Sequence, residues 1–134
     1  MEVLSSRILL RPSDPARSRH FYRDRLGLAV YREFGPPGDP GVVFFLGAGL
    51  LEVSGRSDGP APGPVMIWLQ VRDVAAEHAR LAAAGVPVTR GPTVEPWGLT
   101  EMWIEDPDGV RMVLVEVPAD HPIRRDLRSS PPAS

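Results

Sequence analysis

Asp14-Pro15-Ala16-Arg17 begins a helical pattern that ends at Leu26-Gly27-Leu28, and Asp73-Val74-Ala75-Ala76 begins a second one that ends at Ala84-Gly85-Val86. The two beginnings lie 59 residues apart, and the two glycines lie 58 residues apart. Asp at a helix start and Gly just past a helix end are typical boundary signals. After each helix come short apolar runs, which end in Leu50-Leu51-Glu52-Val53 and Met112-Val113-Leu114-Val115. The second half of the chain therefore repeats the organisation of the first.

The apolar runs around the two helices predict four strands in each half. The predicted strands are residues 6–11, 29–34, 42–46, 50–54, 65–71, 86–90, 100–105 and 110–117. Both halves therefore have the order βαβββ, and helices that precede antiparallel strands favour an α+β fold with the helices on one face of each sheet. We expect one domain over residues 1–134. Its expected parts are a first module at about 5–54, a linker at 55–64, a second module at about 65–118 and a tail at 119–134.

The spacing of apolar residues predicts which face of each helix is buried. In the first helix the expected buried face consists of Ser18, Phe21, Tyr22 and Leu26. In the second helix it consists of Val74, His78, Leu81 and Ala82.

The composition argues against several classes of function. The formal net charge of the 134 residues is −2, which does not suit nucleic acid or an anionic membrane as the main partner. Because the chain has no Cys, it forms no disulfide and no Cys-ligated zinc site. No apolar run reaches the length of a membrane span, and the N-terminus lacks the pattern of a signal peptide. We therefore expect a soluble, cytoplasmic protein.

Three motifs that follow one another along the chain, together with the duplication, resemble those of a known family. They are His20-Phe21-Tyr22-Arg23-Asp24-Arg25-Leu26-Gly27-Leu28, Pro96-Trp97-Gly98 and Asp106-Pro107-Asp108-Gly109. With the βαβββ repeat they resemble the vicinal oxygen chelate superfamily, which contains glyoxalase I, extradiol dioxygenases, and the fosfomycin and bleomycin resistance proteins. The resemblance covers about residues 5–118. It implies that the modules form a curled, half-open barrel of mixed and antiparallel strands with a central cleft.

The resemblance also implies where a metal ion would be held. Metal-dependent members of the superfamily use side chains from the first and last strands of both modules, and the matching positions here are Arg7, Glu52, Met66 and Val113. Arg has no acceptor atom, the Met thioether suits Cu(I) rather than harder ions, and Val has no donor. One carboxylate does not make a metal site. We therefore expect a member without metal or other cofactor, similar to the bleomycin resistance proteins.

Without a metal, Arg7 and Glu52 are expected to form an ion pair in the space that the ion would take. The alternative is that the two charges merely neutralise each other. Strand alternation adds further residues to the same face. The predicted ligand-binding residues are Arg7, Leu9, Glu52, Met66, Trp68, Glu101, Trp103 and Val113. This mixture of aromatic, apolar and charged side chains suits a small, partly aromatic molecule.

The remaining candidates for chemistry are expected to have structural roles. His20, His78 and His121 lie on none of the predicted cleft strands, and we predict no catalytic residue. We expect Glu101 to pair with an arginine such as Arg11 or Arg111. We expect Trp97 to anchor its loop on its own module, the alternative being a lid over the cleft.

These inferences favour a protein that binds or sequesters a small molecule, either an antibiotic or a pathway intermediate, without turnover. One alternative is an enzyme of the same superfamily: a cofactor-free isomerase or lyase with Glu52 or Glu101 as base, or a metal-dependent lyase or dioxygenase with unusual ligands. A non-catalytic interaction module is a further alternative. The resemblance also implies a homodimer, with the cleft formed either within one chain or between subunits.

Overall fold

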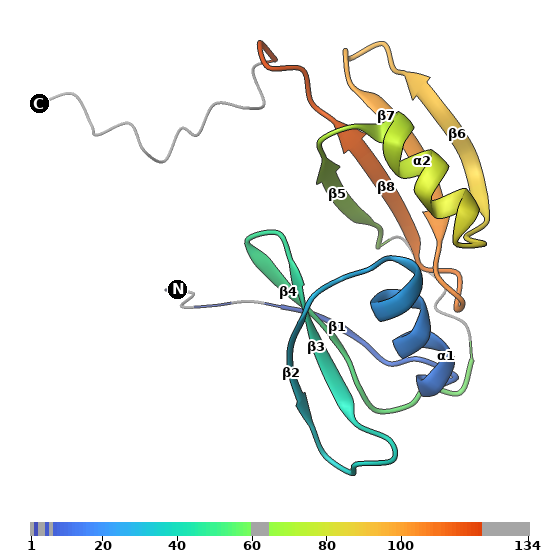
Figure 1. The fold of residues 1–134 in the computed structure, drawn as a ribbon. Coiled ribbons are helices and arrows are strands. Elements are labelled where there is room, and N and C mark those ends of the chain that lie inside the picture. Colours follow the sequence, from blue (N-terminus) through green and yellow to red (C-terminus); the bar gives the residue numbers. More distant parts are fainter. Residues whose placement is uncertain (1, 3–4, 6, 60–64, 122–134) are drawn as a thin grey trace, which may run out of the picture.

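The computed structural model describes residues 2, 5, 7–59 and 65–121, and it has the order βαβββ twice. The first module contains β1 (Ile8–Leu10), α1 (Pro15–His20) with its π-helical continuation η1 (Phe21–Arg25), β2 (Val30–Phe34), β3 (Gly41–Leu46) and β4 (Gly49–Val53). The second module contains β5 (Ile67–Val71), α2 (Val74–Ala83), β6 (Val88–Val94), β7 (Thr100–Glu105) and β8 (Arg111–Glu116). In Figure 1 each helix lies against its own sheet. The predicted α+β duplication is confirmed.

The two sheets have the same topology. Their strand orders are β1-β4-β3-β2 and β5-β8-β7-β6. In each sheet the first strand pairs in parallel with the last strand of its module, and the other pairs are antiparallel. Both sheets are mixed and neither closes on itself, as predicted. Among the described residues, the strands at the sheet edges are β1, β2, β5 and β6.

The helix boundaries follow the signals in the sequence. Asp14 Oδ1 accepts a hydrogen bond from the Arg17 N–H at 3.1 Å, and Asp73 Oδ1 accepts one from the Ala76 N–H at 3.0 Å. After the helices, Gly27 has φ of 71° and so takes the left-handed conformation that favours glycine. The caps and the glycines therefore limit both helices as expected.

Two details differ from the sequence-based expectation. Ala82 is exposed, because the buried stripe of α2 runs through Val74 and Leu81 with His78 half-buried, and Ala82 lies beside it. Strand β6 extends to Val94 instead of ending near residue 90. As an edge strand with register shifts, it accommodates Pro92 without losing its pairing with β7.

The main hydrophobic core lies on the helix side of the sheets and includes residues of both modules. Phe21, Tyr22 and Phe44 of the first module belong to the same buried cluster as Met102 and Met112 of the second. A smaller cluster lies on the opposite face of the second sheet and consists of Leu99, Val113, Val115 and Val117, with Trp103 packed against it. The helix-side face thus joins the modules, and the opposite faces are left for another use.

A polar junction connects the modules at the Asp106–Gly109 turn. The Tyr22 hydroxyl donates to Asp106 Oδ2 at 2.7 Å, and the backbone N–H groups of Asp108 and Val110 donate to Asp106 Oδ1 at 2.8 Å. Asp108 in turn accepts hydrogen bonds from the backbone N–H and the hydroxyl of Ser13, just before α1. Burial raises the pKa of Asp106 despite these donors, and burial together with the Asp106 charge raises the pKa of Tyr22.

We predict that Tyr22→Phe lowers the free energy of unfolding by about 1–3 kcal/mol at pH 7, because it leaves a buried carboxylate oxygen without its donor. Asp106 has a higher pKa in the folded than in the unfolded state, so its contribution is fully present below the unfolded pKa, near pH 4, and is lost as pH rises through the folded pKa. Tyr22→Phe lacks the hydrogen bond that stabilises the ionised form of Asp106. The difference in free energy of unfolding between the variant and the wild type should therefore become smaller as the pH falls toward about 4, as measured by urea unfolding.

Tyr31→Phe is the matched control, because Tyr31 is exposed and none of the described hydrogen bonds involves its hydroxyl. Its free energy of unfolding should stay within about 0.5 kcal/mol of wild type. Equal effects of the two substitutions, or a deficit of Tyr22→Phe that does not change with pH, would contradict this account of the junction.

Candidate ligand-binding site

The face of the first sheet that points away from α1 carries the predicted ion pair. Arg7 Nη1 lies 2.9 Å from Glu52 Oε1. Leu9 is the register partner of Glu52, and Glu52 is the partner of Val43 on β3. Directly paired residues project from the same face of a sheet. Arg7, Leu9 and Glu52 therefore lie together as the alternation predicted.

Glu52 is part of a longer polar network. The Ser54 hydroxyl donates to Glu52 Oε2 at 2.7 Å and accepts from Arg11 Nη1 at 2.9 Å. The hydrogen bond from Ser54, together with the Arg7 guanidinium, holds the pKa of the Glu52 carboxyl below its ordinary range, against a smaller opposing effect of desolvation. Glu52 is therefore an ionised acceptor at neutral pH, and each of its two carboxylate oxygens accepts one hydrogen bond within the protein.

Aromatic side chains on the same face were missed by the sequence analysis. Phe45 lies two residues beyond Val43 on β3, and its ring meets that of Tyr31 edge-on with centroids 5.3 Å apart. The Arg32 guanidinium lies 5.4 Å above the centre of the Phe34 ring. Tyr31, Phe34 and Phe45 are all exposed. Continuing the alternation from Glu52 across the register to β3 and β2 identifies Phe45 and its neighbours.

The corresponding face of the second sheet carries the predicted tryptophans. Trp68 is the register partner of Val113, and Val113 is the partner of Trp103, so the three side chains form one row. Met66 precedes Trp68 by two residues. Met66 and Trp68 are each 47% exposed, Trp103 is half-buried, and Val113 is buried in the smaller apolar cluster. The predicted set is thus together on this face, but Val113 contributes to its support rather than to its exposed surface.

Glu101 has a different partner from the predicted one. It is buried on the same face as Trp103, and its Oε2 accepts a hydrogen bond from Trp97 Nε1 at 2.7 Å. None of the ion pairs among the described residues involves Glu101, and Arg11 binds Ser54 instead. The expected pairing of Glu101 with Arg11 or Arg111 was therefore wrong, because the loop at Trp97 folds back over the carboxylate.

The Trp97 loop is held from both sides on its own module. The Trp97 indole binds Glu101, and the Trp97 carbonyl oxygen lies 2.9 Å from His121 Nε2, which acts as the donor. Gly98 has φ of 89° and lies against the His121 ring. The role of Trp97 as a loop anchor is confirmed, and the structure gives His121 a role in holding that loop.

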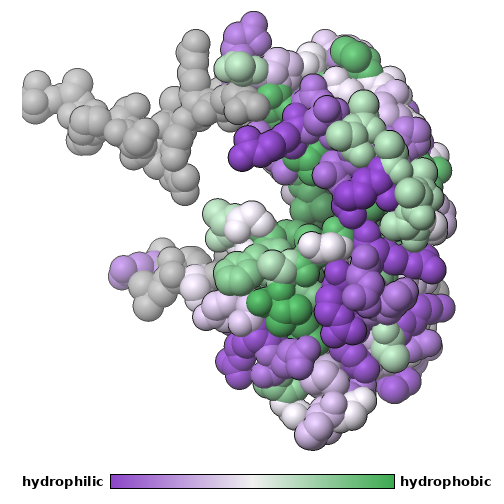
Figure 2. Space-filling view, in the orientation of Figure 1, coloured by the Kyte–Doolittle hydropathy of each residue, from purple (hydrophilic) through white to green (hydrophobic). Residues whose placement is uncertain are grey.

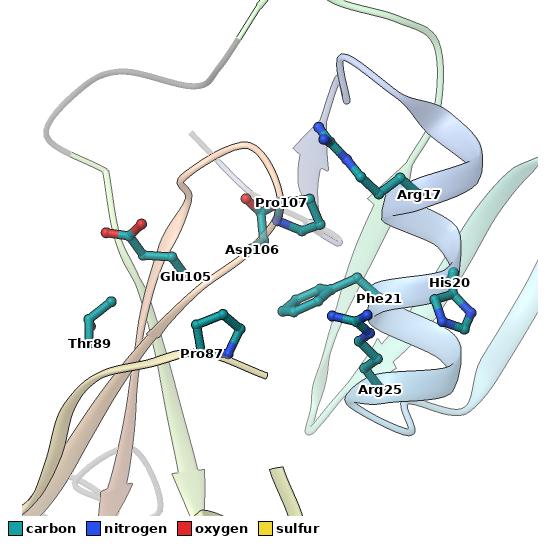
Figure 3. A pocket seen from close by; sticks show the side chains of 9 residues that line it. All are labelled: Arg17, His20, Phe21, Arg25, Pro87, Thr89, Glu105, Asp106 and Pro107. Atoms are coloured by element: carbon teal, nitrogen blue, oxygen red, sulfur yellow. The ribbon is translucent and has the colours of Figure 1, made fainter. Parts of the chain in front are cut away.

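Two open cavities flank these elements. One of about 590 Å³ lies between the β3–β4 turn at Leu46–Ala48 and strand β5 from Trp68 to Arg72. Figure 2 shows that the molecule is hollowed between the two modules, with apolar side chains along the inner wall. The other, of about 290 Å³, lies on the helix side of the molecule between η1 and the ends of β6 and β7 (Figure 3). Of the predicted site residues, only Trp68 lines either cavity.

Comparison with known proteins places this geometry in a family. Residues 5–114 match the family model of the Glyoxalase/Bleomycin resistance protein/Dioxygenase superfamily. The chain belongs to this superfamily. No protein with a curated description matches it in sequence.

Solved structures with the same fold are similar to this chain. A superfamily member from Sphaerobacter thermophilus is 27% identical with a TM-score of 0.68, and the match covers 87% of this chain and 98% of that one. TioX from Micromonospora is 22% identical with a TM-score of 0.71 and coverage of 84% and 97%. The lactoylglutathione lyase of Agrobacterium tumefaciens is 22% identical with a TM-score of 0.66 and coverage of 87% and 94%. The last two likenesses are evidence for the fold.

The residues that the sequence resemblance assigns to the metal positions do not fit a divalent ion. Arg7 presents a guanidinium there and already binds the carboxylate of Glu52. Met66 and Val113 offer no hard donor atom. Within residues 7–59 and 65–121, no three His, Asp or Glu side chains come together in the way that a metal ion needs. The Glu52 carboxylate is therefore paired with a cationic side chain of the protein, the Arg7 guanidinium.

We predict that Ser54→Ala raises the pKa of Glu52 toward its ordinary range, because it removes the strongest of the interactions that favour the ionised carboxylate. A carboxyl-carbon NMR titration would measure the change. Ser57→Ala is the control, since the Ser57 hydroxyl binds the Gly59 carbonyl and not Glu52. An unchanged or lower Glu52 pKa in Ser54→Ala would refute this assignment.

Proposed function

We propose that this protein binds a small, partly aromatic molecule without a metal ion, in the manner of a sequestering protein rather than an enzyme. The observation that carries the proposal is the 2.9 Å contact between Arg7 and Glu52. The sequence resemblance assigns both residues to positions that hold metal ligands in other members of the superfamily. The Arg7 guanidinium binds the Glu52 carboxylate oxygen that would otherwise be available to a metal ion.

The state of Glu52 also favours binding over catalysis. A general base needs a pKa near the working pH, whereas Ser54 and Arg7 lower that of Glu52. Glu52 is therefore a weak base but a good hydrogen-bond acceptor. This supports a role in holding a polar group of a ligand rather than in proton abstraction.

Aromatic surface on both sheets supports a flat ligand. Tyr31 and Phe45 are exposed on the first sheet, and Trp68 is exposed on the second. Rings of this kind stack on planar molecules and contribute about 0.5–1.5 kcal/mol beyond the buried area. The apolar wall seen in Figure 2 agrees with a ligand that is largely apolar.

The surroundings of Glu101 favour a ligand that carries a positive charge. Its carboxylate is buried beside Trp103 and accepts a hydrogen bond from the neutral Trp97 indole, and none of the described ion pairs balances it. A buried charge without an opposite charge is unfavourable. A basic group on the ligand would provide that charge and would take over the hydrogen bond of Trp97.

We predict that the protein binds 9-aminoacridine, a flat cation, with higher affinity than neutral acridine, as measured by quenching of its tryptophan fluorescence. Glu101→Gln keeps an acceptor for Trp97 but removes the charge. It should therefore lower the affinity for 9-aminoacridine about tenfold and leave the affinity for acridine unchanged. Glu33→Gln removes the same charge from the helix-side face of the first sheet, where Glu33 pairs with Val42 and faces Arg23, and it should change neither affinity.

Two results would contradict different parts of the proposal. If neither acridine changes the fluorescence of the protein, the binding function itself fails. If both bind equally and Glu101→Gln has no effect, only the basic group of the ligand is refuted. Elemental analysis of protein purified without added metal provides a separate check, since a stoichiometric divalent ion would overturn the metal-free site.

We further propose that the protein is a homodimer, with the β1 edge of one subunit next to the β5 edge of the other. Both edges lack a strand partner among the described residues. Apolar side chains are exposed along both, with Leu9 at 48% and Val65 at 75%. Such a pairing would bring the Arg7–Glu52 face of one subunit close to the Met66–Trp68 face of its partner and form a cleft between them.

We predict that light scattering gives twice the 14.6 kDa chain mass for the wild type and the single chain mass for Val65→Asp, because the charge enters the proposed contact. Val94→Asp is the matched control, since Val94 is 74% exposed at the opposite edge of the same sheet. It should remain dimeric. A monomeric wild type, or dimers in both variants, would refute this arrangement.

A further inference from the structure

The helix-side cavity is separate from the proposed ligand-binding face and joins the two modules. One of its walls is the helical segment from Arg17 to Arg25, and the other is formed by Pro87, Thr89 and the start of the Asp106 turn. Figure 3 shows Phe21 and Arg25 pointing from the helix toward Pro87. The volume of about 290 Å³ is near the lower limit of small-molecule sites.

The helical wall provides positive charge that the protein does not fully use. Arg25 Nη1 makes a long contact of 3.4 Å to the Gly85 carbonyl, and none of the described ion pairs involves Arg25. Arg17, at the other end of the wall, makes contacts of 3.5 Å to Asp108 and 3.2 Å to the Ser13 hydroxyl. His20 also lines the cavity, and its Nδ1 lies 2.8 Å from Asp24 Oδ2, so that its imidazole already has an acidic partner. Arg25 is therefore the guanidinium best placed to accept an anion.

The middle of the cavity is apolar. The Phe21 ring is 3% exposed and is fixed edge-on against Tyr22, with ring centroids 5.1 Å apart. Pro87 lies opposite Phe21, and Pro107 closes the upper end as drawn in Figure 3. Phe21 thus supports the floor of the cavity from within the core, and a planar ligand ring above this floor would lie against Pro87.

The opposite wall provides an acceptor. Asp106 contacts the cavity, but both its carboxylate oxygens are taken by Tyr22 and by backbone N–H groups. Glu105 is exposed, and none of the described side-chain hydrogen bonds or ion pairs involves it. Thr89 lies beside it in Figure 3. A second anionic group near this wall would be repelled, whereas a hydroxyl or amine would find an acceptor.

From this arrangement we propose that the helix-side cavity binds a small aromatic carboxylate that carries a hydrogen-bond donor at the far end of its ring. The carboxylate pairs with Arg25, the ring lies against Pro87 above the floor that Phe21 supports, and the donor binds Glu105. The site would take its ligand independently of the proposed function of the other face. Because both modules line the cavity, a bound ligand also contacts both sides of the junction.

The test uses 4-hydroxybenzoate and the full ¹⁵N-labelled chain. Titration should shift the backbone amide signals of Phe21, Arg25, Thr89 and Glu105 with a dissociation constant of about 1 mM, as expected for a ligand of this size. The indole signals of the three tryptophans should not move, because none of them lines this cavity. This separates the site from the ligand-binding face.

Substitutions then test each contact. Arg25→Gln should weaken 4-hydroxybenzoate about tenfold, through loss of a charge-assisted bond. Arg23→Gln removes the same charge from the same segment, where Arg23 faces Asp24 and Glu33, and should leave the affinity unchanged. The wild type should prefer 4-hydroxybenzoate to 4-methoxybenzoate, and Glu105→Gln should reduce that preference.

Several outcomes would overturn the proposal. They are the absence of saturable shifts up to about 10 mM, shifts centred on the tryptophans, or equal affinity of a folded Arg25→Gln variant. If Arg25→Gln does not fold, the comparison of the two benzoates in Glu105→Gln decides instead, and an unchanged preference would then refute the site.

Discussion

The structure depends on the buried bond between the Tyr22 hydroxyl and Asp106. It joins a helix of the first module to a turn of the second, 84 residues later in the chain. The cost of burying the Asp106 carboxylate is offset by three donors, two of which are backbone N–H groups of its own turn. The turn is therefore shaped by the same residue that holds it against η1.

This junction decides which surfaces remain available. Because the modules meet through their helix-side faces, the opposite face of each sheet is not needed for the shared core. The Arg7–Glu52 pair and the tryptophan row lie on those opposite faces, and the helix-side cavity opens beside the junction itself. The chain belongs to a superfamily in which one fold serves different functions, and the proposed function rests on the side chains of these faces.

Much of this arrangement could be predicted from the sequence, because it rests on periodic signals. The capping residues Asp14 and Asp73 set the helix starts. Alternation correctly predicted that Arg7 shares a sheet face with Glu52, and Trp68 with Trp103. The partner of Glu101 could not be predicted, since it depends on how the loop at Trp97 folds back. The contact between the Tyr31 and Phe45 rings could not be predicted either, because it depends on the register between β2 and β3, which includes a shift. The helix-side cavity is formed by residues of both modules and has no local signal.

The strand edges of the two sheets are unequal in a way that bears on self-association. The outer strands β2 and β6 both pair irregularly, and β6 also contains Pro92, whereas the pairs that β1 and β5 make have no shift in register. Irregular edges and proline are obstacles to the addition of further strands. Irregular pairing at β2 and β6 therefore opposes the growth of a continuous sheet into fibrils at both outer ends. The proposed contact between subunits would use the two regular edges, β1 and β5.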